Sequence, residues 1–259
     1  MSKKPQKKKP AGKPQRSRPK RTPRASAAAT SSDGKIRLNK YIANSGICSR
    51  READTYIATG LVTVNGKVVN EMGHKVNLED DVRFDGRRIN PEPDTYILLN
   101  KPKGVATTNS ESKGLTVMDL IAKAGSARVK PIGRLGRNAT GLLLFTNDDK
   151  LVKRFHSNGM ERLFHVELDK NLKAEDLEQV AKGLRIDGKT IEVEEISYVD
   201  GAPRKEVGIR IKHMGNSVLR TIFSHLGYDV VRIDCVTIAH LTKKDLPRGR
   251  WKILSKKEI

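Results

Sequence analysis

Apolar residues are almost absent from residues 1–32 and become periodic only after about residue 35. Leu38, Tyr41 and Ile42 then recur at the spacing of one helical face. This spacing predicts a short helix that ends near Gly46.

A second short helix is predicted immediately afterwards. Ser49 followed by Glu52 forms a capping box, in which the hydroxyl and the carboxylate bond the first free amides of a helix that runs to about Thr59. The segment LVTVNGKVV alternates about an Asn-Gly pair, which predicts a hairpin. VNLEDDVRFDGRRI predicts another strand pair that turns at an Asp-Gly pair.

The pattern changes again after PEPDT at residues 91–95, which we interpret as a linker. YILLNKPKGVATT is predicted to be a buried strand that enters a Lys-Pro-Lys-Gly loop, and GLLLFTND a second buried strand. Further strands are predicted in LFHVEL, TIEVEEISYV and EVGIRIKHM, and helices in TVMDLIAKAG, DDKLVKRFHS, LKAEDLEQVAKGL and NSVLRTIFSHLG, before the chain ends in YDVVRIDCVTIAHL and LPRGRWKIL. Strands that meet in hairpins, with helices set between them, indicate an α+β protein whose larger part is mixed and mainly antiparallel. We expect an arm at residues 1–32, a small domain at 33–92 and a larger domain at 93–259.

Charge narrows the choice of partner. The chain has 51 Lys and Arg against 30 Asp and Glu, a formal net charge of +21. Such a field attracts polyanions; the alternatives are a solvated basic surface with no fixed partner and adhesion to anionic lipid. With no basic amphipathic helix and no run of 18 apolar residues, we expect no membrane role.

Residues 1–32 carry eleven of these positive charges and no acid, so this segment cannot fold alone. We interpret it as a disordered arm that neutralises phosphates; the alternative is a solubilising tail. The positive N-terminus is not followed by an apolar segment, which favours a cytoplasmic protein over a secreted one. A transit peptide is the alternative, but five prolines in the arm argue against an amphipathic helix.

Cysteine and histidine suggest no metal or redox chemistry. Cys48 and Cys235 lie far apart, and the six histidines lack the spacing of metal ligands. We therefore expect reduced thiols and no metal site.

Two groups of basic residues are candidates for RNA contact. Arg37, Lys40, Arg50 and Arg51 fall on or beside the two predicted short helices and could form one face for a phosphate backbone. An ordinary helix pair with a solvated charged side explains their spacing equally well.

The second group lies in GRLGRNATG, where Arg134 and Arg137 flank a Gly-rich turn that leads into an apolar strand. Guanidinium groups and backbone amides there could hold a phosphate. The alternative is a structural turn with solvated arginines.

Two family resemblances sharpen this picture. RLNKYIANSGICSRREADTYIATGLVTVNGKVV resembles the alpha-L RNA-binding motif, which a small-subunit ribosomal protein, tyrosyl-tRNA synthetases and several RNA-modifying enzymes share. LLNKPKGV, TVMDLI, PIGRL, TGLLLFTND, HVELDK, HLGY and LTKKDLPRG, in this order, resemble the RsuA-like pseudouridine synthases of ribosomal RNA. This resemblance implies uridine isomerisation without a cofactor, on a base taken out of its stack. We also expect Lys101 and Lys103 of the Lys-Pro-Lys-Gly loop to contact RNA.

Three departures from that family surround one expected pocket. The family's GRLD motif ends in the aspartate that forms or stabilises the intermediate, and here that position is Gly136. The family's K-x-Y-x-V strand places a tyrosine against the target base, and here that position is Phe164. A hydrogen atom cannot replace a carboxylate nucleophile, whereas a phenylalanine keeps the stacking and loses the hydroxyl.

The third departure lies in the helix before HLGY. The family has a motif like GKNRxVRR there, and this chain has MGNSVLRT. Asn216 and Arg220 remain as RNA contacts, while Ser217 and Thr221 replace arginines expected to support the carboxylate. Buried guanidinium groups left without their carboxylate partner would destabilise the fold. Loss of the arginines together with the aspartate is therefore physically consistent.

A displaced acid could in principle replace the missing one. Asp148 and Asp149 lie beyond GLLLFTN, and four strand residues already span about 13 Å. We interpret both acids as the N-terminus of the next helix instead.

These observations favour a ribosomal RNA-binding protein on a pseudouridine synthase scaffold, inactive as an enzyme, acting in ribosome assembly or as a ribosome-associated component. The first alternative is a working pseudouridine synthase, and the second is a nonspecific nucleic-acid-coating protein. We expect structured ribosomal RNA and ribosomal subunits as partners, no small-molecule substrate, and a monomer.

Removal of residues 1–32 should weaken RNA binding and lower its salt dependence, because eleven cations are lost. Site choice should not change, because phosphate contacts carry no sequence information. Binding titrations at several salt concentrations and crosslinking footprints of both proteins measure the two effects. A footprint that moves would contradict the view that residues 1–32 supply affinity and the rest of the chain selects the site.

Overall fold

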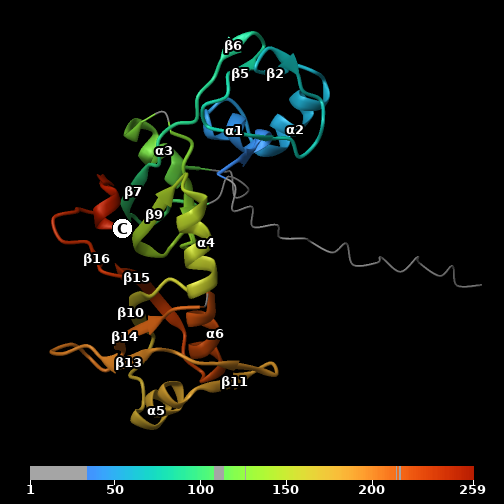
Figure 1. Cartoon of the computed structure of the whole chain (residues 1–259). Coiled ribbons are helices and arrows are strands. Elements are labelled where there is room, and N and C mark those ends of the chain that lie inside the picture. Colours follow the sequence, from blue (N-terminus) through green and yellow to red (C-terminus); the bar gives the residue numbers. More distant parts are fainter. Residues whose placement is uncertain (1–33, 108–113, 126, 214, 216) are drawn as a thin grey trace, which may run out of the picture. The chain divides into compact units, whose positions relative to one another are not determined.

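The computed structural model describes residues 34–107, 114–125, 127–213, 215 and 217–259 (Figure 1). The predicted arm at 1–32 and the candidate RNA contact Asn216 lie outside the described residues.

The N-terminal part contains both predicted short helices. α1 covers Leu38–Asn44 and α2 covers Arg50–Ala58. Ser49 caps α2 and forms the predicted capping box with Glu52, so that prediction is confirmed. Asn39 donates to the carboxylate of Asp54 over 2.9 Å and joins the two helices.

Both predicted hairpins of this part are also confirmed. They form a four-stranded sheet of order β3-β2-β5-β6, made of β2 (Val62–Val64), β3 (Lys67–Val68), β5 (Val82–Phe84) and β6 (Arg87–Arg88). Both turns use two residues with positive φ, Asn65 and Gly66 in one and Asp85 and Gly86 in the other. Such pairs match the twist of a two-residue hairpin. A separate pair joins β1 (Ile36–Arg37) to β4 (Lys75–Val76).

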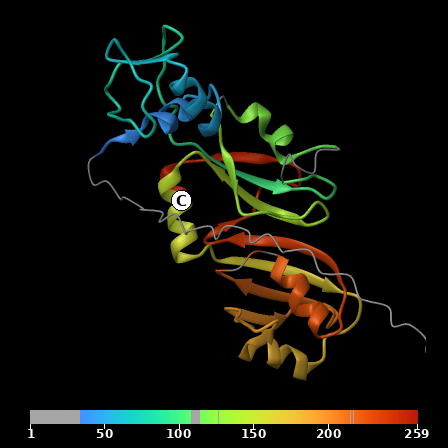
Figure 2. The same cartoon turned by 90° about the vertical axis from the view of Figure 1, so that its right-hand side faces the viewer.

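The remainder of the chain is organised on a nine-stranded sheet whose main path is β13-β14-β10-β15-β9-β7-β17. Figure 2 shows these strands one above another, from β17 in red and β7 in green to β14 in orange. The strands are β7 (Tyr96–Lys101), β8 (Lys130–Ile132), β9 (Thr140–Thr146), β10 (Arg162–Leu168), β13 (Glu195–Tyr198), β14 (Glu206–Ile211), β15 (Val230–Ile238), β16 (Leu241–Thr242) and β17 (Trp251–Leu254). β7 and β9 are buried along their whole length.

Four helices belong to this part: α3 (Val117–Ile121), α4 (Asp149–Asn158), α5 (Ala174–Lys182) and α6 (Ser217–His225). α6 buries Leu219, Ile222 and Phe223 in the core beneath the sheet. The helix predicted in TVMDLIAKAG is shorter than expected, since α3 passes into a 3-10 turn at Ala122–Ala124. A separate small hairpin is formed by β11 (Leu184–Ile186) and β12 (Lys189–Ile191).

The fold class is confirmed as a small helical and β domain followed by a mixed, mainly antiparallel α+β domain. Within the large sheet, the described residues show one parallel pairing, between β9 and β15. None of the helices in the described ranges has the length and apolar character needed to cross a bilayer.

That parallel pairing is short and tightly packed. It matches Thr140 with Asp234 and Gly141 with Cys235, and it joins the two halves of the sheet. Gly141 has a φ of +101°, and a Cβ there would collide with the backbone of Cys235. Only glycine satisfies both conditions without moving a strand.

We expect Gly141→Ala to lower the free energy of unfolding by roughly 3 kcal/mol, through overpacking and left-handed strain. Gly104→Ala is the matched control, because Gly104 has a φ of +84° but a Cβ there meets nothing within 4 Å. Thermal and denaturant unfolding of both variants measure the difference. Equal losses would show that the close approach of β9 and β15 is not what requires glycine.

Candidate functional site

The segment between β8 and β9, residues 133–139, is held from several sides. Thr107 donates its hydroxyl to the carbonyl of Leu135 over 2.6 Å and accepts from the amide of Leu135 over 3.3 Å. The Gly104 amide donates to the carbonyl of Arg137 over 2.9 Å, and Arg137 returns a bond to the carbonyl of Gly104 over 3.2 Å. The loop is therefore fixed to the segment that follows β7.

A buried lysine completes this attachment. Lys101 has no exposed surface, and its ammonium donates to the carbonyls of Pro102, Gly136, Arg137 and Ala139 over 2.7–3.2 Å. A buried cation needs such acceptors, because burial without them is costly. In this structure the charge of Lys101 therefore serves the loop backbone, and its contact with RNA stays a prediction.

Gly136 lies in this loop at an open position. Its φ is outside the left-handed region, and a Cβ added to it would meet nothing within 4 Å. The carbonyl of Gly136 accepts from the amide of Ala139 over 3.0 Å, which closes a turn. Neither backbone strain nor crowding requires glycine here, so the absence of a side chain leaves space.

That space belongs to a cavity of about 790 Å³. Its walls come from the 133–139 loop, the end of α4, the starts of β10 and α6, the end of β14, and Ile233 of β15. The cavity thus lies beside the junction at which β9 and β15 separate. This volume is in the range of small-molecule and cofactor sites.

The lining of the cavity is strongly basic. Five cationic side chains line it, together with His156 and His213, and no Asp or Glu is among its described lining residues; the cations are Arg134, Arg137, Arg162, Lys212 and Arg220. α6 begins at Ser217 on the wall, so the positive end of its dipole adds to the field. The described residues contain no group of three His, Cys, Asp or Glu placed to bind a metal. The cavity is suited to an anionic ligand.

Arg162 is the residue that motif reading missed. It opens β10, is only 7% exposed, and its guanidinium carbon lies 5.6 Å from the centre of the Phe164 ring. Burial lowers the pKa of this guanidinium. The first letter of RLFHV, in the lysine position of K-x-Y-x-V, was the available signal. A guanidinium is therefore present on the cavity wall at the start of β10.

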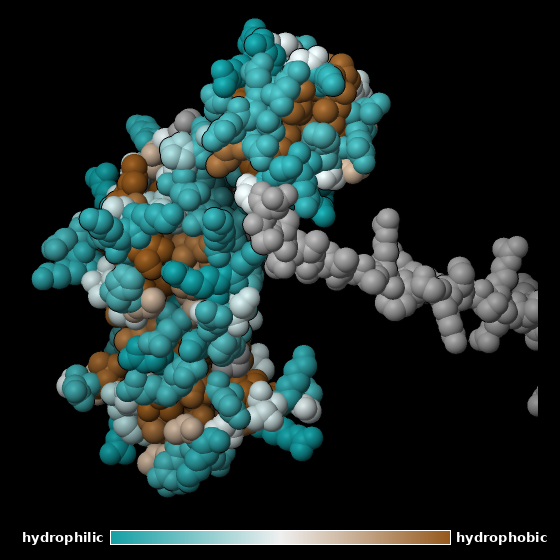
Figure 3. Space-filling model, in the orientation of Figure 1, coloured by the Kyte–Doolittle hydropathy of each residue, from teal (hydrophilic) through white to brown (hydrophobic). Residues whose placement is uncertain are grey.

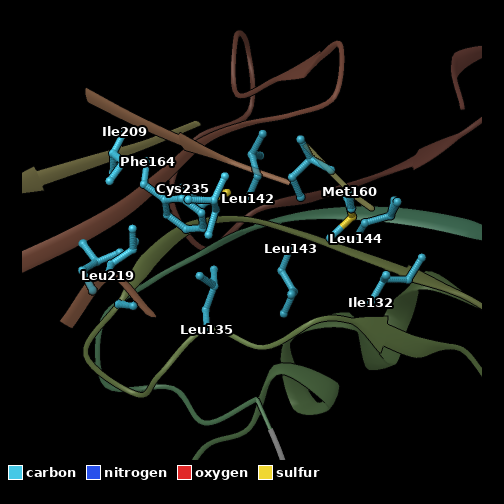
Figure 4. Packing of buried hydrophobic residues seen from close by; sticks show 14 of the residues in the cluster. Ile132, Leu135, Leu142, Leu143, Leu144, Met160, Phe164, Ile209, Leu219 and Cys235 are labelled. Atoms are coloured by element: carbon cyan, nitrogen blue, oxygen red, sulfur yellow. The ribbon is translucent and has the colours of Figure 1, made fainter. Parts of the chain in front are cut away.

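Phe164 does not line the cavity. Its ring has no exposed surface and packs within the core cluster (Figure 4). Its stacking on a base stays a prediction, because the ring has no exposed face in this structure. In Figure 4 the ring lies beside Cys235, between Ile209 and Leu142. Burial of the apolar ring among these side chains is more favourable than its exposure to water.

Other predicted RNA contacts are placed as follows. Arg134, Arg137 and Arg220 line the cavity, and Arg220 also donates to the carbonyl of Val230 over 2.9 Å. Lys103 is exposed in the turn after β7. These positions leave their contact with RNA a prediction.

The basic residues of the small domain are only partly brought together. Lys40 and Arg50 both approach the carboxylate of Asp149, at 3.0 and 3.8 Å, while Arg37 and Arg51 are exposed. A surface ion pair of this kind contributes little to stability. Much of the face shown in Figure 3 is hydrophilic, as expected for so charged a chain.

The acids that end β9 have structural partners. Asp148 caps α4 by accepting from the amides of Lys150 and Leu151, and it also accepts from the hydroxyl of Tyr96 over 3.0 Å. Their interpretation as a helix N-terminus is confirmed. Neither Asp148 nor Asp149 lines the cavity.

We expect Lys101→Met to lower the free energy of unfolding by about 3 kcal/mol, because buried carbonyls of the loop lose their donor. Lys103→Met, two residues away and exposed, should change it by less than about 0.5 kcal/mol. Denaturant unfolding of both variants measures the contrast. A small effect at Lys101 would mean that water or another donor replaces the ammonium.

Comparisons with known proteins agree with this architecture. The RNA pseudouridylate synthase family model matches residues 95–213, and the S4 domain model matches residues 36–82. A crystal structure of a pseudouridylate synthase superposes with a TM-score of 0.59 at 23% identity, covering 86% of this chain and 97% of that one. This likeness shows a shared fold.

Two curated relatives cover most of the chain. The dual-specificity RNA pseudouridine synthase RluF of Escherichia coli (strain K12) is 33% identical over 242 residues, 88% of this chain and 78% of the relative. Ribosomal large subunit pseudouridine synthase B of Bacillus subtilis (strain 168) is 33% identical over 236 residues, 86% of this chain and 93% of the relative. With an S4 domain followed by a synthase domain of this type, the chain belongs to the RsuA-like family of RNA pseudouridine synthases.

Proposed function

We propose that this protein binds structured ribosomal RNA on a pseudouridine synthase scaffold and does not isomerise uridine. Binding would use the basic cavity, the cationic residues of the S4 domain and the arm at residues 1–32. The relatives are named as synthases of RNA and of the large ribosomal subunit, which supports ribosomal RNA as the partner. Its place would be in ribosome assembly or on a ribosomal subunit.

One observation carries the proposal: the loop position that should bear the carboxylate is Gly136, in a cavity with no acid among its described lining residues. Isomerisation in this family depends on a carboxylate that acts at the glycosidic carbon. Without such a group, only binding and orientation remain, and these accelerate a reaction far less than the full site does.

Asp234, a buried carboxylate of β15, is not a replacement. Asp234 accepts from the hydroxyl of Thr140 over 2.6 Å, pairs with Lys243, and lies 3.4 Å from Arg248. Burial would raise the pKa of Asp234, but hydrogen bonds from Lys243 and Thr140 outweigh it and hold that pKa below its usual value. A carboxylate with these partners is a stabilised anion that joins β9 to β15, and it does not line the cavity.

The second candidate function is an active synthase that uses a displaced acid. It is favoured by relatives at 33% identity that are named as synthases.

Purified protein should form no detectable pseudouridine in ribosomal RNA transcripts, while the RluF-type relative at equal concentration serves as the positive control. In cells, deletion of the gene should leave every pseudouridine site of ribosomal RNA in place. Chemical mapping of pseudouridine by primer extension measures both. One site lost on deletion and restored by the wild-type gene would reject the proposal.

The binding half needs a separate measurement. Crosslinking and sequencing should give a focused footprint on ribosomal RNA, since a folded basic cavity restricts orientation in a way that an arm alone does not. A diffuse footprint over all RNA would instead support a nonspecific coating protein.

A further inference from the structure

We propose that Asn158 and Gly159, at the end of α4, are a site of spontaneous covalent modification that the imidazole of His213 promotes. The amide nitrogen of Gly159 attacks the side-chain carbonyl carbon of Asn158, the bond from that carbon to its own nitrogen breaks, and ammonia leaves. Water then opens the cyclic succinimide at either carbonyl, which gives aspartate or isoaspartate. Either product adds one negative charge to the chain.

The chain has two Asn-Gly pairs, and the structure holds their asparagines differently. At Asn65 both ends of the side-chain amide are bonded: its nitrogen donates to Asp80 over 3.1 Å, and its oxygen accepts from the amide of Asp81 over 2.9 Å. Asn158 is exposed, and its side chain forms no hydrogen bond within the described ranges. Of the two, Asn158 is therefore the one whose carbonyl carbon can turn toward the next amide.

Gly159 is suited to act as the attacking residue. Because it has no Cβ, its amide nitrogen is open to the approaching carbonyl carbon. Among the described residues this amide donates no hydrogen bond of normal geometry, whereas Thr59, which follows α2 in the same way, donates to the carbonyl of Thr55 over 3.0 Å. The last turn of α4 is thus not closed by such a bond, and helix ends fray.

The proposed base is His213, which follows β14. A Cβ on Gly159 would lie 2.8 Å from both Cε1 and Nδ1 of His213, so the imidazole packs directly against this glycine. A neutral imidazole is the usual proton acceptor of proteins at physiological pH. It takes the proton of the Gly159 amide during the attack and returns it to the departing nitrogen, so that ammonia is released.

The product changes one side of the cavity. Gly159, Lys212 and His213 line it, and the new carboxylate stands on the neighbouring residue. An isoaspartate at 158 also lengthens the main chain by one carbon beside a glycine that has no room for a Cβ. We therefore expect modified protein to attract RNA less strongly. This consequence rests on the proposed function, whereas the modification itself does not.

Peptide mass spectrometry of the full chain, incubated at neutral pH and sampled over time, follows both asparagines in the same molecules. Asn158 should be converted several-fold faster than Asn65 in folded protein. The two rates should approach each other in guanidinium chloride, because unfolding removes both the bonds of Asn65 and the contact with His213. Equal rates in folded protein, or the same ratio of rates in both conditions, would overturn the proposal.

Two histidine variants test the base. His213→Gln should slow the conversion of Asn158 several-fold and leave that of Asn65 unchanged. His225→Gln is the matched control, because His225 is exposed at the end of α6 and does not line the cavity, so Asn158 should be converted at the wild-type rate. An unchanged rate in His213→Gln, or an equal loss in both variants, would overturn the proposal.

Binding titrations separate the modification from the proposed function. Asn158→Asp should bind ribosomal RNA several-fold more weakly than Asn158→Gln, since only the first variant adds a negative charge. If Asn158 is converted as expected but the two variants bind RNA equally, the modification stands and the cavity is rejected as the RNA site. If RNA binding is focused but Asn158 is not converted faster than Asn65, this inference fails and the proposed function stands.

Discussion

A buried ammonium group must be surrounded by acceptors, and at Lys101 those acceptors are backbone carbonyls of the loop that forms one wall of the cavity. The end of β7 and the start of β9 are thereby locked together, whatever side chain stands at position 136. This explains how the loop keeps a defined conformation with glycine there. The scaffold of the site and the reactive group of the site are physically separate, so one can persist without the other.

The same separation holds across the sheet. β9 and β15 meet in parallel over two residue pairs, where Gly141 lets the backbones approach and Thr140 donates to Asp234. The carboxylate of Asp234 is held by its own cations, outside the cavity. The carboxylate of Asp234 thus helps to join the two halves of the sheet. The cavity wall, by contrast, carries positive charge.

Local signals predicted most of the fold. The capping box at Ser49, the Asn-Gly and Asp-Gly turns and the apolar runs of β7 and β9 depend on neighbouring residues, and all were confirmed. Burial of polar residues could not be predicted, because it depends on contacts distant in sequence. Lys101 was taken for an RNA contact since lysine is rarely buried. Arg162 was overlooked because its place in the lysine position of K-x-Y-x-V marks a basic residue but not its burial.

The cationic residues of the cavity wall bear on the proposal that the cavity binds RNA. Two arginines expected from the family are replaced by Ser217 and Thr221, as loss of a carboxylate partner would favour. Arg162 and Arg220 nevertheless stay on the wall. Burial of a guanidinium costs free energy that its contacts must offset, and an apolar side chain of similar size would often stabilise the fold as well or better. Positive charge on the wall is what the proposed binding of RNA requires, because a polyanion is attracted by that charge whether or not a carboxylate stands beside it.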